Sequence, residues 1–389
     1  METLQTVIQA VNPGDWLLAL DLKDAYLHVP IHIMSQKYLR FKVNNQAYQF
    51  QVLPFGLSAS PRVFTKILAP WAALARLKGI HIYPYLDDIL IKASSPELVV
   101  THLHQVTEIL IQAGFILNLK KSHLEPTQDL IFIGARFRTS MGLVQTHQER
   151  FQSLLDMLKM FQLGNMVTAR QFLRLLGIMA SMIQVVQHSR LHMRPLQLYL
   201  LALWRMASKD LEAMIPIRES LVPHLKWWRC PRNVFQGVPL IPPKHQVLIT
   251  TDASSTHGWG GCMGNATVQG TWEPAMASKH INELELEAVS RTLKHFQSWI
   301  LGKVVLVQSD NATTVSYINR QGGTRSPSLC MAVFRLLKWA IQLNITLRAE
   351  FIPGVQNSRA DALSRQFASP LEWQLNPAIV QWVFNVLDR

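Results

Sequence analysis

The amino-acid sequence predicts a mixed α/β fold of the α+β kind, divided among several domains. The chain has 389 residues, more than the roughly 250–300 that one hydrophobic core usually serves. Its hydrophobic fraction of 49% excludes a disordered chain. Strand-type and helix-type patterns alternate near both ends, and a helical stretch and a proline-rich stretch separate them. We expect five parts, at residues 1–145, 146–210, 211–245, 246–367 and 368–389.

The first part combines strands with two helices. Apolar residues spaced by three or four follow Ser60 and Ser95, each of which precedes a proline, so a helix is expected to begin at each. Alternating stretches on both sides of residues 44–45, two asparagines, indicate a hairpin. Further strands are expected at residues 16–22, 131–137 and, as two runs meeting at a bend, 80–92.

The middle of the chain is expected to be helical from 150 to 210, with Thr168 capping one helix. Six prolines in residues 211–245 indicate a connector. The last part begins again with strands, and its helices are expected from Asn282 and at 357–365. This order predicts a central mixed sheet with helices packed on it. Its strands are expected at 247–251, 258–263, 268–272, 304–307 and 345–352.

Composition excludes several classes of protein. Three widely spaced cysteines form neither a disulfide framework nor a zinc site. The longest uncharged, mostly apolar stretch has 15 residues, fewer than the roughly 18 that a membrane span needs. No signal peptide is visible. The odd number and wide spacing of the cysteines lead us to expect a reducing intracellular compartment, cytoplasmic or nuclear.

The net charge of +13 is concentrated in residues 151–245, which hold 12 basic and 4 acidic groups. Such a field attracts polyanions, of which nucleic acid is the commonest large one. The alternative is a basic protein without such a partner.

Three carboxylates stand out in the first part. Asp21 ends a strand, and Asp87 and Asp88 lie at the bend of an expected hairpin, where they should be exposed. Carboxylates brought together repel each other unless divalent cations neutralise them, and Mg²⁺ prefers such oxygen ligands. Two metals so held can activate a 3′-hydroxyl and stabilise a leaving pyrophosphate. The alternative is an ordinary turn, in which Asp is common.

Five segments in order resemble the palm motifs of reverse transcriptases. They are LDLKDAY at 20–26, LPFGLSASP at 53–61, YLDD at 85–88, NLKKS at 118–122 and FIG at 132–134. The resemblance implies an RNA-directed DNA polymerase that uses an RNA template, a DNA primer and deoxynucleoside triphosphates. It makes residues 1–145 a palm with partial fingers.

The same resemblance assigns roles to individual residues. Metal binding and catalysis fall on Asp21, Asp87 and Asp88. Tyr26 falls where the family excludes a ribose 2′-hydroxyl. Contacts to nucleotide, template or triphosphate fall on Phe55, Gly56 and Lys121. Relatives carry several tens of residues of fingers before the first catalytic Asp, whereas 20 residues precede Asp21 here. We therefore expect a fragment with truncated fingers and impaired polymerase activity.

A second carboxylate set lies in the last part. Its aspartates follow or lie in expected elements: Asp252 after a strand, Asp310 after another and Asp361 in the short final helix. The fourth acid is chosen from one helix.

Helical geometry favours Glu285 as this fourth acid. It shares a partly apolar face, whereas Glu287 pairs with Arg291 at i+4 and Glu283 faces other charged groups. An acid on a packed face needs a partner, which a metal supplies. The alternative is a capping box between Glu285 and Asn282.

The order strand–Asp, helix–Glu, strand–Asp, helix–Asp resembles the ribonuclease H fold over residues 246–367. The resemblance makes Asp252, Glu285, Asp310 and Asp361 the ligands of two Mg²⁺ ions, with Mn²⁺ possible in their place. It implies cleavage of the RNA strand of an RNA–DNA hybrid. Relatives often have a His in a loop where this chain has Phe351, so slower turnover is expected.

Between the two sets, residues 169–177 and 194–196 resemble the helical thumb of retroelement polymerases, whose basic groups grip duplex phosphates. A plain helical linker is the alternative.

The amino-acid sequences at 54–57, 175–180 and 322–326 resemble those of DIRS-like retrotransposons, which integrate with a tyrosine recombinase. Two other hypotheses remain: a non-catalytic nucleic-acid-binding relic of such an element, and a cellular ribonuclease H with a basic extension. The oligomeric state is left open.

Overall fold

The computed structural model describes residues 2–205, 210–366 and 377–387. The chain divides into two compact units, which are described separately. Unit 1 contains Met1–His192 and Leu203–Pro242, and unit 2 contains Met193–Ala202 and Pro243–Arg389. Among the described residues, no helix combines the length and the apolar character needed to cross a membrane.

Unit 1 is built on a four-stranded sheet in the order β4-β5-β1-β6. Its strands are β1 (Trp16–Asp21), β4 (His81–Tyr85), β5 (Asp88–Ala93) and β6 (His123–Thr127). The two expected helices form and pack against each other and the sheet: α3 (Ser60–Leu77) and α4 (Pro96–Gln112). Ser95 caps α4 through its side chain, as its place before Pro96 predicts. The core between these layers is aliphatic, apart from Phe64 and Phe115.

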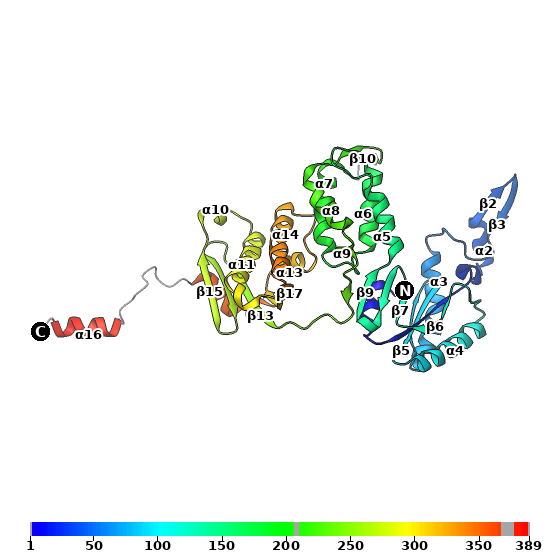
Figure 1. Cartoon of the computed structure of the whole chain (residues 1–389), viewed down its shortest axis with the longest axis horizontal. Coiled ribbons are helices and arrows are strands. Elements are labelled where there is room, and N and C mark those ends of the chain that lie inside the picture. The colour runs from blue at the N-terminus through cyan, green and yellow to red at the C-terminus, as the bar shows by residue number, and fades with distance from the viewer. Residues whose placement is uncertain (1, 206–209, 367–376, 388–389) are drawn as a thin grey trace. The chain divides into compact units, whose positions relative to one another are not determined.

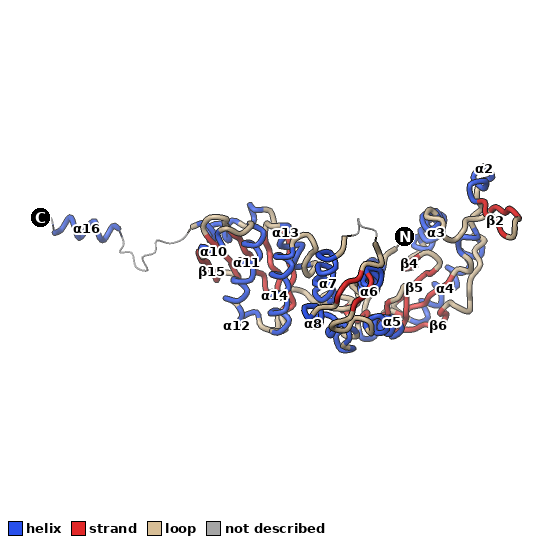
Figure 2. The backbone as a smooth tube through the Cα atoms, turned by 90° about the horizontal axis from the view of Figure 1, so that it is seen from above, coloured by secondary structure: helices blue, strands red, loops and turns tan. Residues whose placement is uncertain are grey.

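The expected hairpin at 44–45 forms and stands out beyond α3 (Figures 1 and 2). Its strands β2 (Arg40–Val43) and β3 (Gln46–Gln49) are exposed throughout. Asn44 and Asn45 have φ values of 46° and 65°, a left-handed conformation that asparagine tolerates and a two-residue hairpin turn requires. Short helices complete this region: α1 (Leu4–Ala10), η1 (Ala25–His28), α2 (Ile33–Gln36) and η2 (Lys37–Leu39).

A second sheet of unit 1 corrects one prediction. Residues 131–137 are two antiparallel strands and not one, because the chain turns at Ile133 and Gly134, whose φ values are 41° and 78°. The apolar residues on both sides of this turn conceal it in the sequence. The sheet has the order β12-β9-β8-β7. Its elements are β7 (Asp129–Phe132), β8 (Ala135–Arg138), η3 (Thr139–Met141), β9 (Leu143–Thr146) and β12 (Val238–Pro239).

The helical middle of the chain differs from the expectation at one place. Residues 166–168 are extended and pair with residues 214–216, so the stretch 150–210 is not helical throughout. Thr168 does cap the next helix, in a capping box with Gln171. The elements are α5 (Gln148–Leu158), β10 (Met166–Thr168), α6 (Ala169–Ser181), α7 (Ser189–Leu203) and β11 (Met214–Pro216).

The proline-rich stretch 211–245, expected to be a connector, contains regular elements. It forms η5 (Glu219–Leu221), α8 (Val222–Arg229) and α9 (Pro231–Val234) besides β11 and β12. Prolines stand in the first turn of α8 and of α9, where a missing N–H costs nothing. Trp228 of α8 is completely buried.

We expect Trp228→Ala to destabilise unit 1 by about 3–5 kcal/mol, because it leaves a large cavity. The matched control is Trp299→Ala, which removes an indole that is 56% exposed in unit 2 and should cost less than about 1 kcal/mol. Calorimetry of the full chain measures both. Equal, small shifts for the two variants would contradict a structural role for α8.

Unit 2 contains the expected mixed sheet, in the order β15-β14-β13-β16-β17. Strands β13, β14 and β15 are antiparallel, whereas β13, β16 and β17 are parallel. The strands are β13 (Val247–Ala253), β14 (Gly258–Met263), β15 (Ala266–Thr271), β16 (Val304–Ser309) and β17 (Thr346–Phe351).

Helices cover both faces of this sheet. A Cβ built on Gly260 would meet α15, and one built on Gly261 would meet α11. Neighbouring residues of a strand point to opposite faces, so α11 and α15 lie on opposite sides. The helices are α10 (Pro274–Ala277), α11 (Ile281–His295), α12 (Gln297–Ile300), α13 (Ala312–Asn319), α14 (Pro327–Gln342), η6 (Gly354–Gln356) and α15 (Ser358–Arg365). In the expected C-terminal tail, Pro377–Leu387 forms α16, and residues 368–376 and 388–389 lie outside the described ranges.

Candidate metal-binding carboxylate sites

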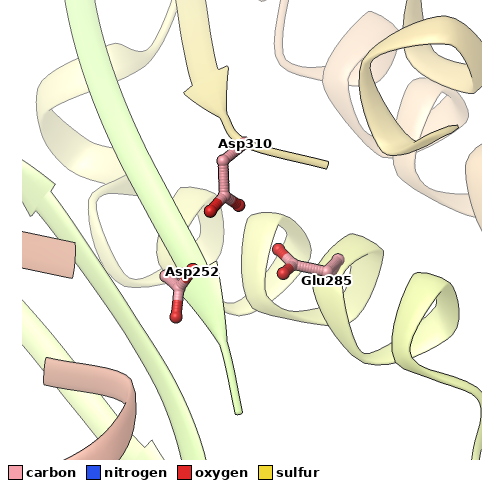
Figure 3. Close-up of side chains that lie close together, drawn as sticks. All are labelled: Asp252, Glu285 and Asp310. Atoms are coloured by element: carbon pink, nitrogen blue, oxygen red, sulfur yellow. The ribbon is translucent and has the colours of Figure 1, made fainter. Parts of the chain in front are cut away.

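Asp252, Glu285 and Asp310 come together at one edge of the unit 2 sheet (Figure 3). Each offers an oxygen, and these three atoms lie within 4.8 Å of one another. The parallel strands β13 and β16 end at the same edge, and their register pairs Thr250 with Gln308, two residues before each aspartate. Helix α11 packs on β13 and carries Glu285 to the same place.

Burial makes this set electrostatically costly. Asp252 and Glu285 are 3% and 4% exposed. Desolvation, with the charges of Asp252 and Asp310, raises the pKa of Glu285 to about 9. Desolvation also raises the pKa of Asp252, against a hydrogen bond from Ser364. The oxygen Oε2 of Glu285 is buried without a hydrogen-bond partner. An all-oxygen set with an unsatisfied buried acceptor fits a hard divalent cation.

The capping alternative for Glu285 is excluded. The N-cap of α11 is His280, whose ring accepts the N–H of Asn282, so Asn282 lies inside the helix. Its side-chain oxygen instead accepts a hydrogen bond from Asn311 at 2.9 Å. The Glu287–Arg291 pair forms as expected, at 3.0 Å.

Asp361 lies outside the close set of three. Its carboxylate accepts a hydrogen bond from Arg365 at 2.7 Å, one turn along α15, but its charge is near enough to raise the pKa of Asp252.

Phe351 is the last residue of β17 and is therefore not in a loop. It is 51% exposed. The turn that follows reaches the site through Gly354, where a Cβ would lie 3.2 Å from Oδ2 of Asp310.

Two further residues hold Asp252, and sequence reasoning missed both. Ser364 donates its hydroxyl to Oδ2 at 2.5 Å, and Asn357 donates to the carbonyl of Thr251 at 3.0 Å. The one available signal was the position of Ser364, three residues after Asp361 on the same helix.

The carboxylates of unit 1 are neighbours but less tightly grouped. Asp21 ends β1 directly opposite Asp88 of β5, and Asp87 occupies the turn before β5. Within the described residues only the unit 2 set has three ligand atoms within 4.8 Å, so these carboxylates are farther apart. Asp87 is exposed as expected, whereas Asp21 and Asp88 are half-buried.

Burial, Asp87 and Asp21 raise the pKa of Asp88 to about 6, and Lys121 opposes the shift. Burial raises the pKa of Asp21 as well, whereas Lys121 and a hydrogen bond to Asn118 lower it. The backbone N–H of Asp21 also donates to Ser122 at 3.0 Å. The segment 118–122 therefore supports Asp21 through contacts that the sequence did not reveal.

The other candidate residues of unit 1 lie around these acids. The centroid of the Tyr26 ring lies 5.1 Å from that of Phe55 and 5.6 Å from that of Phe64. Burial and the charge of Asp87 raise the pKa of Tyr26. Phe55 is 64% exposed, and the next residue, Gly56, has a φ of 86° that favours glycine. Lys121 is exposed.

The pKa of Glu285 predicts a pH-dependent stability. Its folded value of about 9 exceeds the unfolded value of 4.5, so the folded state holds the proton more tightly. Its contribution to the free energy of unfolding is therefore fully present below pH 4.5 and is lost as pH rises toward 9. Without divalent cations, Glu285→Gln should raise stability at pH 8 by about 1–3 kcal/mol relative to wild type, and much less at pH 5.

Thermal unfolding at the two pH values in EDTA measures this difference. Glu287→Gln is the matched control, because Glu287 lies on the same helix in a partly exposed ion pair. Equal effects of the two variants at pH 8 would show that burial does not destabilise the charged form of Glu285.

Residues 2–137 match the family described as reverse transcriptase (RNA-dependent DNA polymerase) and therefore form a reverse transcriptase domain. The chain is 24% identical over 384 residues to the enzymatic polyprotein of figwort mosaic virus (strain DxS), covering 94% of this chain and 53% of that one. It is 25% identical over 372 residues to the enzymatic polyprotein of cauliflower mosaic virus (strain Strasbourg), covering 90% and 50%. The chain thus spans about half the length of these curated relatives.

Two solved structures show the fold. The foamy viral protease-reverse transcriptase dRH in complex with double-stranded DNA has a TM-score of 0.54 at 17% identity, over 90% of this chain and 59% of that one. The foamy viral protease-reverse transcriptase in complex with an RNA/DNA hybrid has a TM-score of 0.53 at 16% identity, over 97% and 49%. The mixed α/β, polymerase-like fold predicted from the sequence is confirmed.

Proposed function

We propose that the chain is an RNA-directed DNA polymerase with a fused ribonuclease H, which cleaves the RNA strand of RNA–DNA hybrids by two-metal catalysis. The observation that carries the ribonuclease H half is the set Asp252, Glu285 and Asp310, with its oxygens within 4.8 Å and a buried, unpartnered Oε2 on Glu285. The polymerase half is supported by the reverse transcriptase domain at 2–137.

In unit 2, Asp252, Glu285 and Asp310 would hold divalent cations, Mg²⁺ or Mn²⁺, together with Asp361 from α15. Bound cations supply an activated water and stabilise the oxygen that leaves the phosphodiester. Strands β13 and β16 and helix α11 hold Asp252, Asp310 and Glu285 at one edge of the sheet. The RNA phosphate would therefore meet a preformed site. Burial of Asp252 and Glu285 excludes water from their inner sides.

In unit 1, Asp21, Asp87 and Asp88 would hold the cations of the polymerase. The exposed ring of Phe55 and the backbone at Gly56 are available to the template and the incoming nucleotide. Tyr26, held against Phe55, is the residue that we assign to excluding a ribose 2′-hydroxyl. Lys121, which is exposed and near both Asp21 and Asp88, is assigned to the triphosphate.

The proposed partners are RNA–DNA hybrid, RNA template with DNA primer, and deoxynucleoside triphosphates. The basic residues of 151–245 support this proposal, as do the nucleic acids bound in the two foamy viral structures. We also propose that the chain comes from a DIRS-like retrotransposon, because its amino-acid sequence at 54–57, 175–180 and 322–326 resembles that class. A tyrosine recombinase gene beside the coding sequence in the genome would support that source, and an integrase of another class would contradict it.

Cleavage of labelled RNA in an RNA–DNA hybrid tests the central proposal. The full chain should cut the hybrid in Mg²⁺, leave single-stranded RNA of the same sequence intact, and stop in EDTA. Hybrid binding without cleavage in Mg²⁺ or Mn²⁺ would overturn the proposal and leave a nucleic-acid-binding relic. Primer extension on an RNA template is measured separately, because the two halves use different carboxylates.

A further inference from the structure

Helix α15 approaches the unit 2 sheet more closely than a side chain would allow. Gly260 of β14 lies directly across from Asp252 of β13. A Cβ on Gly260 would lie 2.5 Å from Cβ of Leu363 and 2.8 Å from the carbonyl oxygen of Ala360. The backbone of α15 therefore rests on the strand at a glycine, beside the aspartate.

This approach brings the Ser364 hydroxyl onto Asp252. The Oγ–Oδ2 distance is 2.5 Å, and the two residues are 0% and 3% exposed. The same hydroxyl lies 2.9 Å from the carbonyl oxygen of Asp361. A hydroxyl has one hydrogen, and the shorter bond to a carboxylate is the stronger one. Asn357 contacts the other oxygen of Asp252 only at 3.4 Å, so Ser364 is the main restraint.

We propose that Ser364 is a positioning residue, whose hydroxyl fixes the rotation of the Asp252 carboxylate for divalent cation binding. The last torsion of an aspartate is intrinsically broad, and repulsion from Asp310 and Asp361 favours turning this carboxylate away. With Oδ2 held by Ser364, the remaining oxygen keeps one direction. The proposal rests on the proposed cation site in unit 2, and it concerns how that site is organised.

Cation binding to the full chain tests the proposal without relying on activity. The background Asp21→Asn/Asp88→Asn weakens binding at the unit 1 carboxylates, and free Mn²⁺ is measured by electron paramagnetic resonance. Ser364→Ala should raise the Mn²⁺ dissociation constant about tenfold, as expected when a group that orients a ligand is lost. Ser364→Cys, a weaker donor of similar size, should give an intermediate value.

Two controls bracket this result. Thr292→Val removes another buried hydroxyl of unit 2, one without a hydrogen-bond partner, and should leave the dissociation constant unchanged. Asp310→Asn breaks the set itself and should abolish binding at this site.

In hybrid cleavage, Ser364→Ala should raise the half-saturating Mn²⁺ concentration about tenfold, whereas the rate at saturation stays within a few-fold of wild type.

A dissociation constant for Ser364→Ala within twofold of the background would overturn the positioning role, whatever the cleavage assay shows. An unchanged constant with a lower saturated rate would also overturn it. If Mn²⁺ binds as expected and no variant cleaves hybrid, the proposed function fails while the role of Ser364 stands. Should Ser364→Ala fold poorly by circular dichroism, the Ser364→Cys comparison decides the question.

Discussion

Asp310→Asn is expected to lower Mg²⁺-dependent hybrid cleavage by the full chain at least about 10²-fold. The substitution keeps the shape of the side chain but removes the charge that a bound cation requires. Asp310 is also the half-buried member of the close set, so the change relieves little burial energy and should leave the fold intact. Product formation under single-turnover conditions gives the rate directly.

A matched pair on α11 controls for unspecific loss of charge. Glu285→Gln should lose activity as Asp310→Asn does, whereas Glu287→Gln should stay within about threefold of wild type. Glu287 is two residues away, and its bond to Arg291 is a surface ion pair of small energy. Wild-type cleavage by Asp310→Asn, or equal losses for the two glutamates, would refute the assignment of this site.

Asp88→Asn is expected to abolish primer extension on an RNA template, with a loss of at least about 10²-fold, and to leave hybrid cleavage unchanged. Asp88 stands opposite Asp21 across β1 and β5, and burial, together with the charges of Asp87 and Asp21, raises the pKa of Asp88 to about 6. Neutralising Asp88 removes the repulsion and, with it, a cation ligand. Extension of a labelled DNA primer in Mg²⁺ measures the effect.

Asp24→Asn is the control for the unit 1 experiment. Asp24 is exposed, and its φ of 50° is a conformation that asparagine adopts easily. It should therefore extend primers like wild type. Extension by Asp88→Asn at the wild-type rate would remove these acids from the polymerase site. A parallel loss of hybrid cleavage would instead indicate a folding defect.

The sequence predicted the elements whose patterns are local. The five strands of unit 2 alternate or run apolar between polar turns, and each lies within a few residues of its expected place. The turn at Ile133 and Gly134 was missed because an isoleucine with a φ of 41° carries no turn signal. The prolines of 211–245 predicted a connector because the sequence does not show that two of them, Pro223 and Pro231, stand in first helical turns.

The candidate sites divide in the same way. Residue type and strand ends selected Asp252 and Asp310, and the helical face selected Glu285. Their closeness depends on the parallel pairing of β13 with β16, which joins segments separated by 58 positions in the sequence. The bond from Ser364 spans 112 positions and depends on the close approach at Gly260. No local pattern encodes such a contact.

The division of α7 has a consequence for taking the molecule apart. Residues 193–202 belong to unit 2, whereas the residues on both sides of this segment belong to unit 1. Within unit 2, Arg194 lies near Cys330 and Gly322. The polypeptide therefore passes between the two units three times, and no single peptide-bond cleavage separates them into intact pieces. A fragment that starts at residue 243 would lack residues 193–202 of unit 2, so exchange of unit 2 between such proteins would have to transfer this helical segment as well.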